Sequence, residues 1–159
     1  MSSLSLSPHI EIKITDLRLK KWGLPNYQSS MAAAIDLYAC INEKLILKAG
    51  KPAELISSGI AIHMNNPHMM AIIAPRSGYG HKRGLVLGNS IGIIDADYSG
   101  TVYISAWNRN VLGNDICIDP GDRIAQMIFL PIIRPILNIV RHFSEINDRR
   151  ENGFGSTDF

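Results

Sequence analysis

The sequence predicts an all-β domain, an antiparallel or mixed β-sandwich or barrel with at most one short helix. Short runs rich in β-branched residues recur along the chain, and turn pairs such as Ala49-Gly50, Asn66-Pro67 and Pro120-Gly121 separate them. No long window keeps the 3.6-residue period of an amphipathic helix. Both observations favour sheets over helices.

The first strand is expected at residues 9–15, where HIEIKIT alternates apolar and polar side chains. Residues 16–30 contain glycine, proline and asparagine and predict a surface loop. Residues 31–41 are ambiguous, because their alanines suit a short helix whereas Ile35 and Leu37 suit a strand that enters a turn. We expect a strand there.

Further runs of strand and turn follow the same pattern to the end of the domain. The one short helix is expected around residues 77–83. The runs are residues 44–56, 59–69, 70–84, 85–90, 114–131 and 136–146.

The stretch from residue 88 to residue 108 predicts a β-hairpin with polar residues in its bend. Two apolar runs, 90–94 and 101–107, flank six residues that hold Asp95, Asp97 and a Ser-Gly turn signal. The two carboxylates either bond their own backbone in a solvated turn, which is common for Asp, or carry chemistry. In the second run one face should be buried. Its two alternating sets are Val102, Ile104 and Ala106, and Thr101, Tyr103, Ser105 and Trp107.

Length and charge place limits on the function. A chain of 159 residues makes one domain, and 46% hydrophobic residues leave room for apolar surface buried between subunits. Sixteen basic and 14 acidic residues give a net charge of +2 without long same-sign runs. This argues against a general nucleic-acid or membrane-surface binder. The densest basic cluster, residues 81–83, is expected in a solvated loop.

The cysteines and histidines indicate neither a disulfide framework nor a directly ligated metal. Cys40 and Cys117 are far apart in sequence, and the five histidines show no metal-ligand spacing. A reduced, cytoplasmic setting is therefore expected. The first 15 residues lack the features of a secretory signal, and no apolar run reaches membrane-spanning length.

The composition divides the chain into a single β domain, residues 1–143, and a flexible C-terminal tail, residues 144–159. The tail is polar and poor in core-forming residues, so we expect it to be mobile when free. Residues 153–157, GFGST, combine glycines that allow close backbone approach to an anion with two hydroxyls.

Five segments, in this order and spacing, resemble the motifs of the homotrimeric dUTPase family, the dUTP pyrophosphatases. They are AAAIDLYA around Asp36, APRSGYG at residues 74–80, the stretch 88–108, PGDRIAQMIF at residues 120–129, and RENGFGSTD at residues 150–158. The resemblance covers about residues 29–158. It implies a jelly-roll-like β fold, a homotrimer with shared active sites, and Mg²⁺-dependent hydrolysis of dUTP to dUMP and pyrophosphate. That reaction limits uracil in DNA and supplies dUMP for thymidylate synthesis.

The resemblance also implies roles for residues of the central stretch. Asp95 would orient and deprotonate the water that attacks the α-phosphorus in line. The ring of Tyr98 would lie under the deoxyribose and exclude a 2′-hydroxyl. The wedge that receives uracil would consist of Asn89, Gly92, Ile93, Ile94 and Tyr103.

The remaining motifs imply phosphate and metal contacts. Asp36 would support the water shell of Mg²⁺ without direct ligation. We expect Arg123 to be structural. The residues that would bind the phosphates or close over the base are Arg76, Ser77, Gly78, Gln126, Arg149, Phe154, Gly155, Ser156 and Thr157. The 11 residues from 144 to 154 could span at most ~36 Å when extended. The tail could therefore reach a neighbouring subunit.

Some positions depart from the family pattern. Ala34, Arg150, Asn152 and Asp158 stand where the family often has glycine.

Two alternatives stay open: a dCTP deaminase relative with the same fold, and a catalytically silent trimer that binds a nucleotide or a protein. Release of ammonia from dCTP would identify a deaminase. A silent trimer would be marked by loss of the catalytic base or of the phosphate-binding arginine, and both Asp95 and Arg76 are present.

Overall fold

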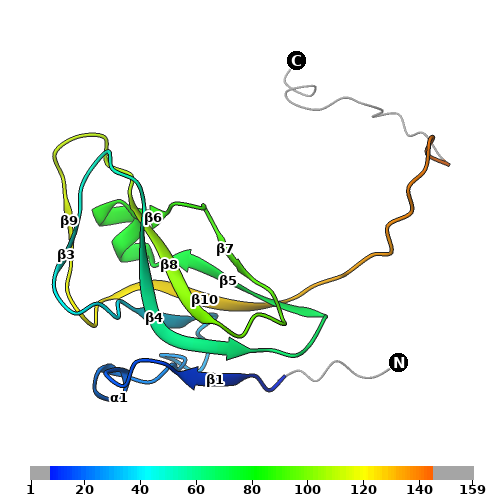
Figure 1. Ribbon diagram of the computed structural model, residues 1–159, viewed down its shortest axis with the longest axis horizontal. Helices are drawn as coiled ribbons and strands as arrows, with labels where there is room; N and C mark the ends of the chain where they lie inside the picture. The colour runs from blue at the N-terminus through cyan, green and yellow to red at the C-terminus, as the bar shows by residue number, and fades with distance from the viewer. Residues whose placement is uncertain (1–7, 145–159) are drawn as a thin grey trace.

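The computed structural model describes residues 8–144, which form a β-sandwich (Figure 1). One sheet has the strand order β1-β4-β8-β6, the other β2-β10-β5-β7, and β3 and β9 form a separate ribbon. All pairs are antiparallel. The strands are β1 (Glu11–Ile14), β2 (Ile35–Tyr38), β3 (Leu45–Leu47), β4 (Glu54–His63), β5 (Met69–Pro75), β6 (Leu85–Leu87), β7 (Gly92–Ile94), β8 (Thr101–Asn108), β9 (Ile116–Ile118) and β10 (Arg123–Pro131).

Alternation along the strands gives each sheet one buried face. Val102, Ile104 and Ala106 of β8 are fully buried, whereas Tyr103 and Trp107 are exposed, which confirms the predicted faces. The strands predicted at residues 9–15 and 31–41 are confirmed as β1 and β2. One hydrophobic core joins residues of both four-stranded sheets.

The predicted hairpin between residues 88 and 108 is wrong in its pairing. β7 pairs with β5, whereas β8 pairs with β4 and β6 in the other sheet. A buried glycine explains the close fit of β7 to β5: a Cβ added at Gly92 would lie 3.0 Å from the Cβ of Ile73. The bend at residues 95–100 therefore carries the chain from one sheet to the other.

Strand β4 is continuous where the sequence predicted a break after residue 56. The pairing of β4 with β8 shifts register between Ser57 and Ala61, which indicates a β-bulge. Gly59 lies in this bulge at a φ of 73°, and a Cβ added there would lie 2.5 Å from the Sγ of Cys40. Glycine is therefore required at this position both for its backbone and for space.

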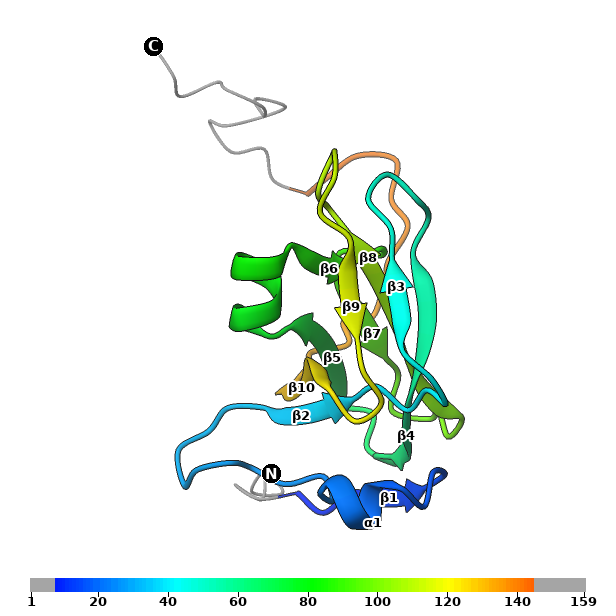
Figure 2. The same cartoon turned by 90° about the vertical axis from the view of Figure 1, so that its left-hand side faces the viewer.

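The structure contains one helix that was expected and one that was not. The predicted helix near residues 77–83 is the π-helix η1 (Gly78–Arg83), which projects beyond the end of β5 (Figure 2). The predicted loop 16–30 was wrong in one part, because it includes α1 (Leu19–Trp22). A single turn is too short to show helical periodicity in the sequence. No helix within residues 8–144 is long and apolar enough to span a membrane.

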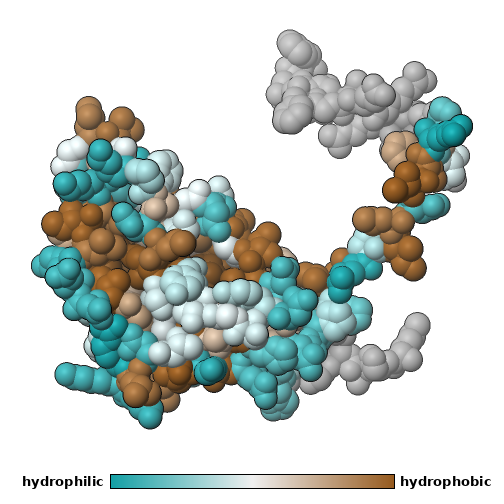
Figure 3. Space-filling model, viewed as in Figure 1, coloured by the Kyte–Doolittle hydropathy of each residue, from teal (hydrophilic) through white to brown (hydrophobic). Residues whose placement is uncertain are grey.

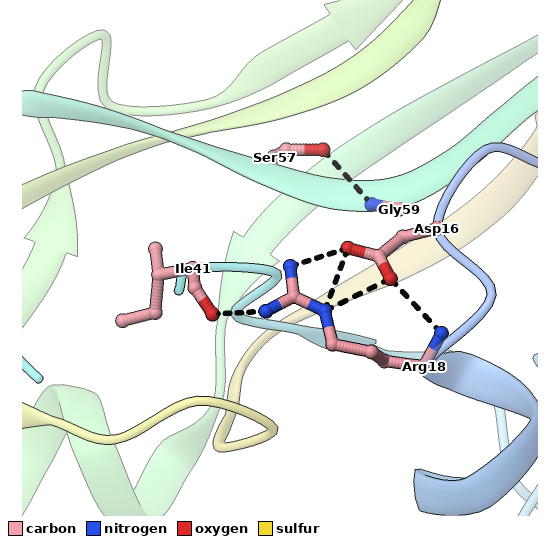
Figure 4. A network of polar contacts seen from close by, with 5 residues as sticks. All are labelled: Asp16, Arg18, Ile41, Ser57 and Gly59. Atoms are coloured by element: carbon pink, nitrogen blue, oxygen red, sulfur yellow. Dashed lines mark hydrogen bonds and ion pairs between the residues drawn. The ribbon is translucent and has the colours of Figure 1, made fainter. Parts of the chain in front are cut away.

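A hydrogen bond from Arg18 attaches the segment before α1 to the chain after β2, and a local ion pair with Asp16 holds the Arg18 side chain (Figure 4). The guanidinium of Arg18 binds the carboxylate of Asp16 at 2.6 Å and donates to the carbonyl of Ile41 at 2.6 Å. Hydrogen bonds from Arg18 hold the pKa of Asp16 below its usual value. Burial raises the pKa of the nearby Cys40 thiol to about 11, so it remains protonated at neutral pH.

After β10 the chain leaves the body as an extended arm, residues 132–144 (Figure 1). The strand predicted at residues 136–146 does not form in the described part of that range. Within residues 8–144 the arm pairs with no strand, and apolar side chains stand out along it (Figure 3). The exposed ones are Ile133, Ile136, Leu137, Ile139, Val140 and Phe143.

Candidate active site

Three of the residues predicted to bind phosphate line one pocket at the end of β5. Arg76, Ser77 and Gly78 line one open pocket with Tyr79, Lys82 and Arg83. Arg76 and Ser77 directly follow β5, and Gly78 begins η1. A cationic side chain, a hydroxyl and a close backbone approach are suited to bind an anion.

The side chain of Arg76 is held in place by two residues of neighbouring strands. Its Nε lies 2.8 Å from Oδ1 of Asp36, and its Nη1 donates to the carbonyl of Arg123 at 3.0 Å. Arg123 in turn binds the other oxygen of Asp36 at 3.1 Å. The side chain of Asp36 is only 11% exposed. Asp36 and Arg123 thus orient Arg76, which is consistent with the structural role expected for Arg123.

Gln126 supports the same turn from β10. It lies opposite Ala74 in the pairing of β10 with β5, and its Nε2 donates to the carbonyl of Pro75 at 2.9 Å. This contact fixes the residue before Arg76. A direct contact of Gln126 with phosphate stays a prediction.

The pocket contains three residues that the sequence did not single out for binding, namely Tyr79, Lys82 and Arg83. Lys82 and Arg83 belong to the basic cluster at residues 81–83, which was interpreted as a solvated loop, and Tyr79 lies in the APRSGYG motif without an assigned role. Tyr79 donates from its hydroxyl to Oδ2 of Asp122 at 2.6 Å. The pKa of Tyr79 is raised to about 12, mainly because the hydroxyl is partly buried and secondly because it donates this hydrogen bond to Asp122.

The residues predicted to read the base and hold the attacking water lie around the bend between β7 and β8. Asp95 directly follows β7 and is exposed in the single chain. Tyr98 is 42% exposed and donates to the carbonyl of Thr101 at 2.8 Å. Its hydroxyl would lie 2.6 Å from a Cβ added at Gly100, so the ring packs on that glycine.

The predicted uracil wedge lies next to this bend in sequence. Asn89 precedes β7, and Gly92, Ile93 and Ile94 make up that strand. Ile93 is exposed and Gly92 is buried. Tyr103 is 51% exposed on the outer face of β8. The order of the chain therefore places exposed apolar and aromatic side chains on both sides of Asp95.

The two groups of residues lie at opposite ends of β5. Ala71 pairs with Ile94, so Asp95 falls beside the start of β5, whereas Arg76 follows its last residue. Six residues of strand separate these points, which is about 20 Å. A triphosphate is much shorter than this distance. One chain therefore does not bring Asp95 to the pocket lined by its own Arg76 and Ser77.

Other predicted site residues have no structural description. Arg149, Phe154, Gly155, Ser156 and Thr157 lie outside the described residues, as does nearly all of the predicted tail. Among residues 8–144 no group of three or more His, Cys, Asp or Glu side chains could hold a metal ion.

Comparison with protein families and known sequences gives a consistent result. The model of the dUTPase family matches residues 20–158. The chain is 49% identical to the deoxyuridine 5′-triphosphate nucleotidohydrolase of Buchnera aphidicola subsp. Acyrthosiphon pisum (strain Tuc7), over 92% of this chain and 94% of that protein. It is 47% identical to the enzyme of the same name from Escherichia coli (strain K12 / DH10B), over 92% and 95%.

Solved structures show the same fold. The dUTPase of Staphylococcus bacteriophage 80alpha with dUPNHPP matches with a TM-score of 0.78 and 23% identity, over 95% of this chain and 99% of that one. A D95N mutant dUTPase from phage phi11 of S. aureus, described with a structural Mg(II) ion, matches with a TM-score of 0.71 and 21% identity, over 86% and 99%. These likenesses confirm the jelly-roll-like β fold.

Proposed function

This chain belongs to the dUTPase family, and on that premise we propose that it hydrolyses dUTP to dUMP and pyrophosphate. The observation that carries the proposal is the pocket after β5, where Asp36 and the carbonyl of Arg123 orient Arg76 beside Ser77 and Gly78. A guanidinium held in this way is suited to bind a phosphate and to stabilise the charge that develops on it.

In the proposed mechanism Asp95 orients a water molecule and accepts its proton as the water attacks the α-phosphorus in line. A carboxylate is a weak base at neutral pH, so its main contribution is to place the nucleophile. The phosphate-binding residues stabilise the negative charge of the transition state. Arg76, Ser77 and Gly78 supply this stabilisation from the described part of the chain.

We propose that substrate selection depends on the bend between β7 and β8. The exposed ring of Tyr98 packs against the deoxyribose and leaves no room for a 2′-hydroxyl. The backbone of residues 92–94, together with Asn89 and Tyr103, contacts uracil. Cytosine would present an amine where uracil presents an acceptor, and the backbone would exclude the methyl group of thymine.

We propose that Mg²⁺ arrives bound to the triphosphate of the nucleotide and contacts the protein through water. No metal-binding group was found among residues 8–144, and Mg²⁺ commonly keeps several waters while it binds phosphates. When bound, the ion would neutralise triphosphate charge. Asp36 remains the candidate for contact through water, although Arg76 and Arg123 already bind its two oxygens.

We infer that the active enzyme is a homotrimer with shared sites. About 20 Å separates Asp95 from Arg76 along β5, so Asp95 of one subunit must meet Arg76 of another. The predicted tail, with Arg149, Phe154 and residues 155–157, would complete the site from a subunit within its reach.

We place the enzyme in the cytoplasm. Both cysteines are free thiols in the structure, Cys40 buried and Cys117 exposed, which suits a reducing compartment. Fractionation of cells that express the protein, followed by dUTPase assay of each fraction, tests this placement. Activity confined to a secreted or membrane fraction would refute it.

The first test of the function compares four nucleotides. With Mg²⁺, the wild type should release pyrophosphate from dUTP and far less from dTTP, dCTP and UTP. Asp95→Asn should bind dUPNHPP as the wild type does and lose at least ~10²-fold in kcat, because the water is no longer held by a carboxylate. Equal hydrolysis of all four nucleotides would refute the specificity, and full activity of the variant would refute the mechanism. Ammonia released from dCTP would indicate a deaminase.

Complementation tests the shared site. Asp95→Asn and Arg76→Ala chains should each be inactive alone. After mixing and exchange of subunits, mixed trimers should regain part of the wild-type activity, because some sites then combine an intact Asp95 with an intact Arg76. Mixtures that stay inactive after subunit exchange is confirmed by mass spectrometry would argue that both residues act within one chain.

A further inference from the structure

The phosphate pocket contains more positive charge than the residues so far assigned to it. Of its lining residues, Arg76, Lys82 and Arg83 are cationic and none is acidic. Asp36 binds Arg76, but within residues 8–144 neither Lys82 nor Arg83 forms an ion pair. The uncompensated charge of the pocket therefore lies on the last turn of η1.

Arg83 is held in a defined position although it is exposed. Its guanidinium carbon lies 4.4 Å from the centre of the Tyr79 ring. Stacking of this kind uses the flat face of the guanidinium and leaves the N–H groups at its edge free to donate. Those edge groups match the geometry of phosphate oxygens.

The ring beneath Arg83 is itself anchored. The hydroxyl of Tyr79 donates to Asp122, and the same carboxylate oxygen of Asp122 accepts from the backbone N–H of Asp119 at 2.9 Å. Because the pKa of Tyr79 is raised to about 12, the hydroxyl stays protonated and keeps donating across the working pH range. The turn between β9 and β10 thus fixes a ring that in turn supports Arg83.

We propose that Arg83 is a further residue that binds the triphosphate of the substrate, and that Tyr79 positions it. The inference rests on the proposed function, because it takes the pocket as the site of the dUTP phosphates. The stacked arrangement lowers the entropy that Arg83 would lose on binding, because part of its freedom is already lost in the free enzyme. Lys82 adds charge to the same pocket but has no aromatic support.

The experiment measures ligand binding to the assembled, full-length protein by calorimetry. The ligands are dUPNHPP, dUMP and inorganic tripolyphosphate. Arg83→Gln should weaken the binding of dUPNHPP and of tripolyphosphate about tenfold, which is the order of a lost charged hydrogen bond. It should change the affinity for dUMP less than twofold. Arg83→Lys should recover part of the affinity. Lys13→Gln removes the same charge from an exposed position on β1 and should change no ligand's affinity.

A double-mutant cycle tests the positioning role of Tyr79. Tyr79→Leu removes the ring, whereas Tyr79→Phe removes only the hydroxyl. Tyr79→Leu should weaken the binding of dUPNHPP almost as much as Arg83→Gln does. The double variant should bind dUPNHPP no more weakly than Arg83→Gln alone. Tyr79→Phe should give a smaller loss. Losses that multiply in the double variant would show that Tyr79 acts independently of Arg83, which would overturn its positioning role.

Two results would overturn the assignment of Arg83. One is an Arg83→Gln variant that binds dUPNHPP and tripolyphosphate within twofold of Lys13→Gln. The other is an equal loss for dUMP and dUPNHPP, because the effect would then not follow the phosphate chain. Failure of the wild type to hydrolyse dUTP would refute the proposed function instead, and the tripolyphosphate comparison would still decide the role of Arg83.

Discussion

At the scale of single residues, Asp36 shows how one carboxylate holds two arginines of a candidate site in place. It is largely buried and binds Arg76 and Arg123, one through each oxygen. A buried carboxylate with two cationic partners is costly to alter, because removal of its charge leaves both partners uncompensated. We therefore interpret Asp36 first as the residue that orients Arg76.

Asp36→Asn should distinguish this role from the predicted contact with Mg²⁺ through water. An amide offers one acceptor oxygen in place of two, so Arg76 should lose its fixed orientation. We expect dUPNHPP to bind about tenfold more weakly in Mg²⁺ and in EDTA alike. Calorimetry under both conditions measures this. A loss confined to Mg²⁺ would instead support the outer-sphere metal role.

At the scale of the element, the sequence predicted which face of a strand is buried better than it predicted its partners. Alternation in β1 and β8 is a local property, so those faces could be read directly. The pairing of β7 with β5 depends on contacts between distant residues, and proximity in sequence wrongly favoured β8. The bulge at Gly59 resembled a break between strands because glycine signals both.

The bulge in β4 gives a testable prediction with an internal control. Gly50 and Gly59 have nearly equal φ values, 70° and 73°, but a Cβ at Gly50 meets nothing within 4 Å. Gly50→Ala should cost roughly 1–2 kcal/mol of unfolding free energy, because an L side chain is strained in the left-handed backbone region. Gly59→Ala should cost roughly 1–3 kcal/mol more, because its methyl group would overlap Cys40. Urea denaturation measures both, and equal losses would show that Cys40 gives way.

At the scale of the whole molecule, the arm after β10 exposes six large apolar side chains. Ile136 and Ile139 are 98% and 99% exposed, which is unfavourable for large apolar side chains in water. The sequence predicted a strand there, and the pattern of the segment fits one. Within residues 8–144 this segment pairs with no strand. We interpret the arm as a segment that packs against another subunit in the proposed trimer.

Charge introduced into the arm should therefore weaken assembly. The double variant Ile136→Asp/Ile139→Asp should shift the molar mass measured by light scattering toward smaller species and lower the dUTPase activity with it. Leu112→Asp alters another highly exposed apolar residue, in the loop after β8, and should leave the mass unchanged. A double variant with unchanged mass and activity would show that the arm is not part of the interface.

The motifs of the site could be identified from the sequence, but their distribution in space could not. Asp95 follows Arg76 by 19 residues in sequence, and the antiparallel pairing of β5 with β7 places the two residues at opposite ends of one strand. The support of Arg83 by Tyr79 and Asp122 also requires the fold, because residues 79 and 122 meet only when η1 packs beside the turn before β10.

The separation of Asp95 from Arg76 along β5 has a consequence for regulation by concentration. If sites are shared between subunits as we propose, an isolated subunit would be inert even when completely folded, since neither end of the strand would carry a full set of reacting groups. Specific activity should thus fall on dilution while circular dichroism stays constant. A cell could silence such an enzyme by lowering its abundance below the threshold for association, without degrading the last copies.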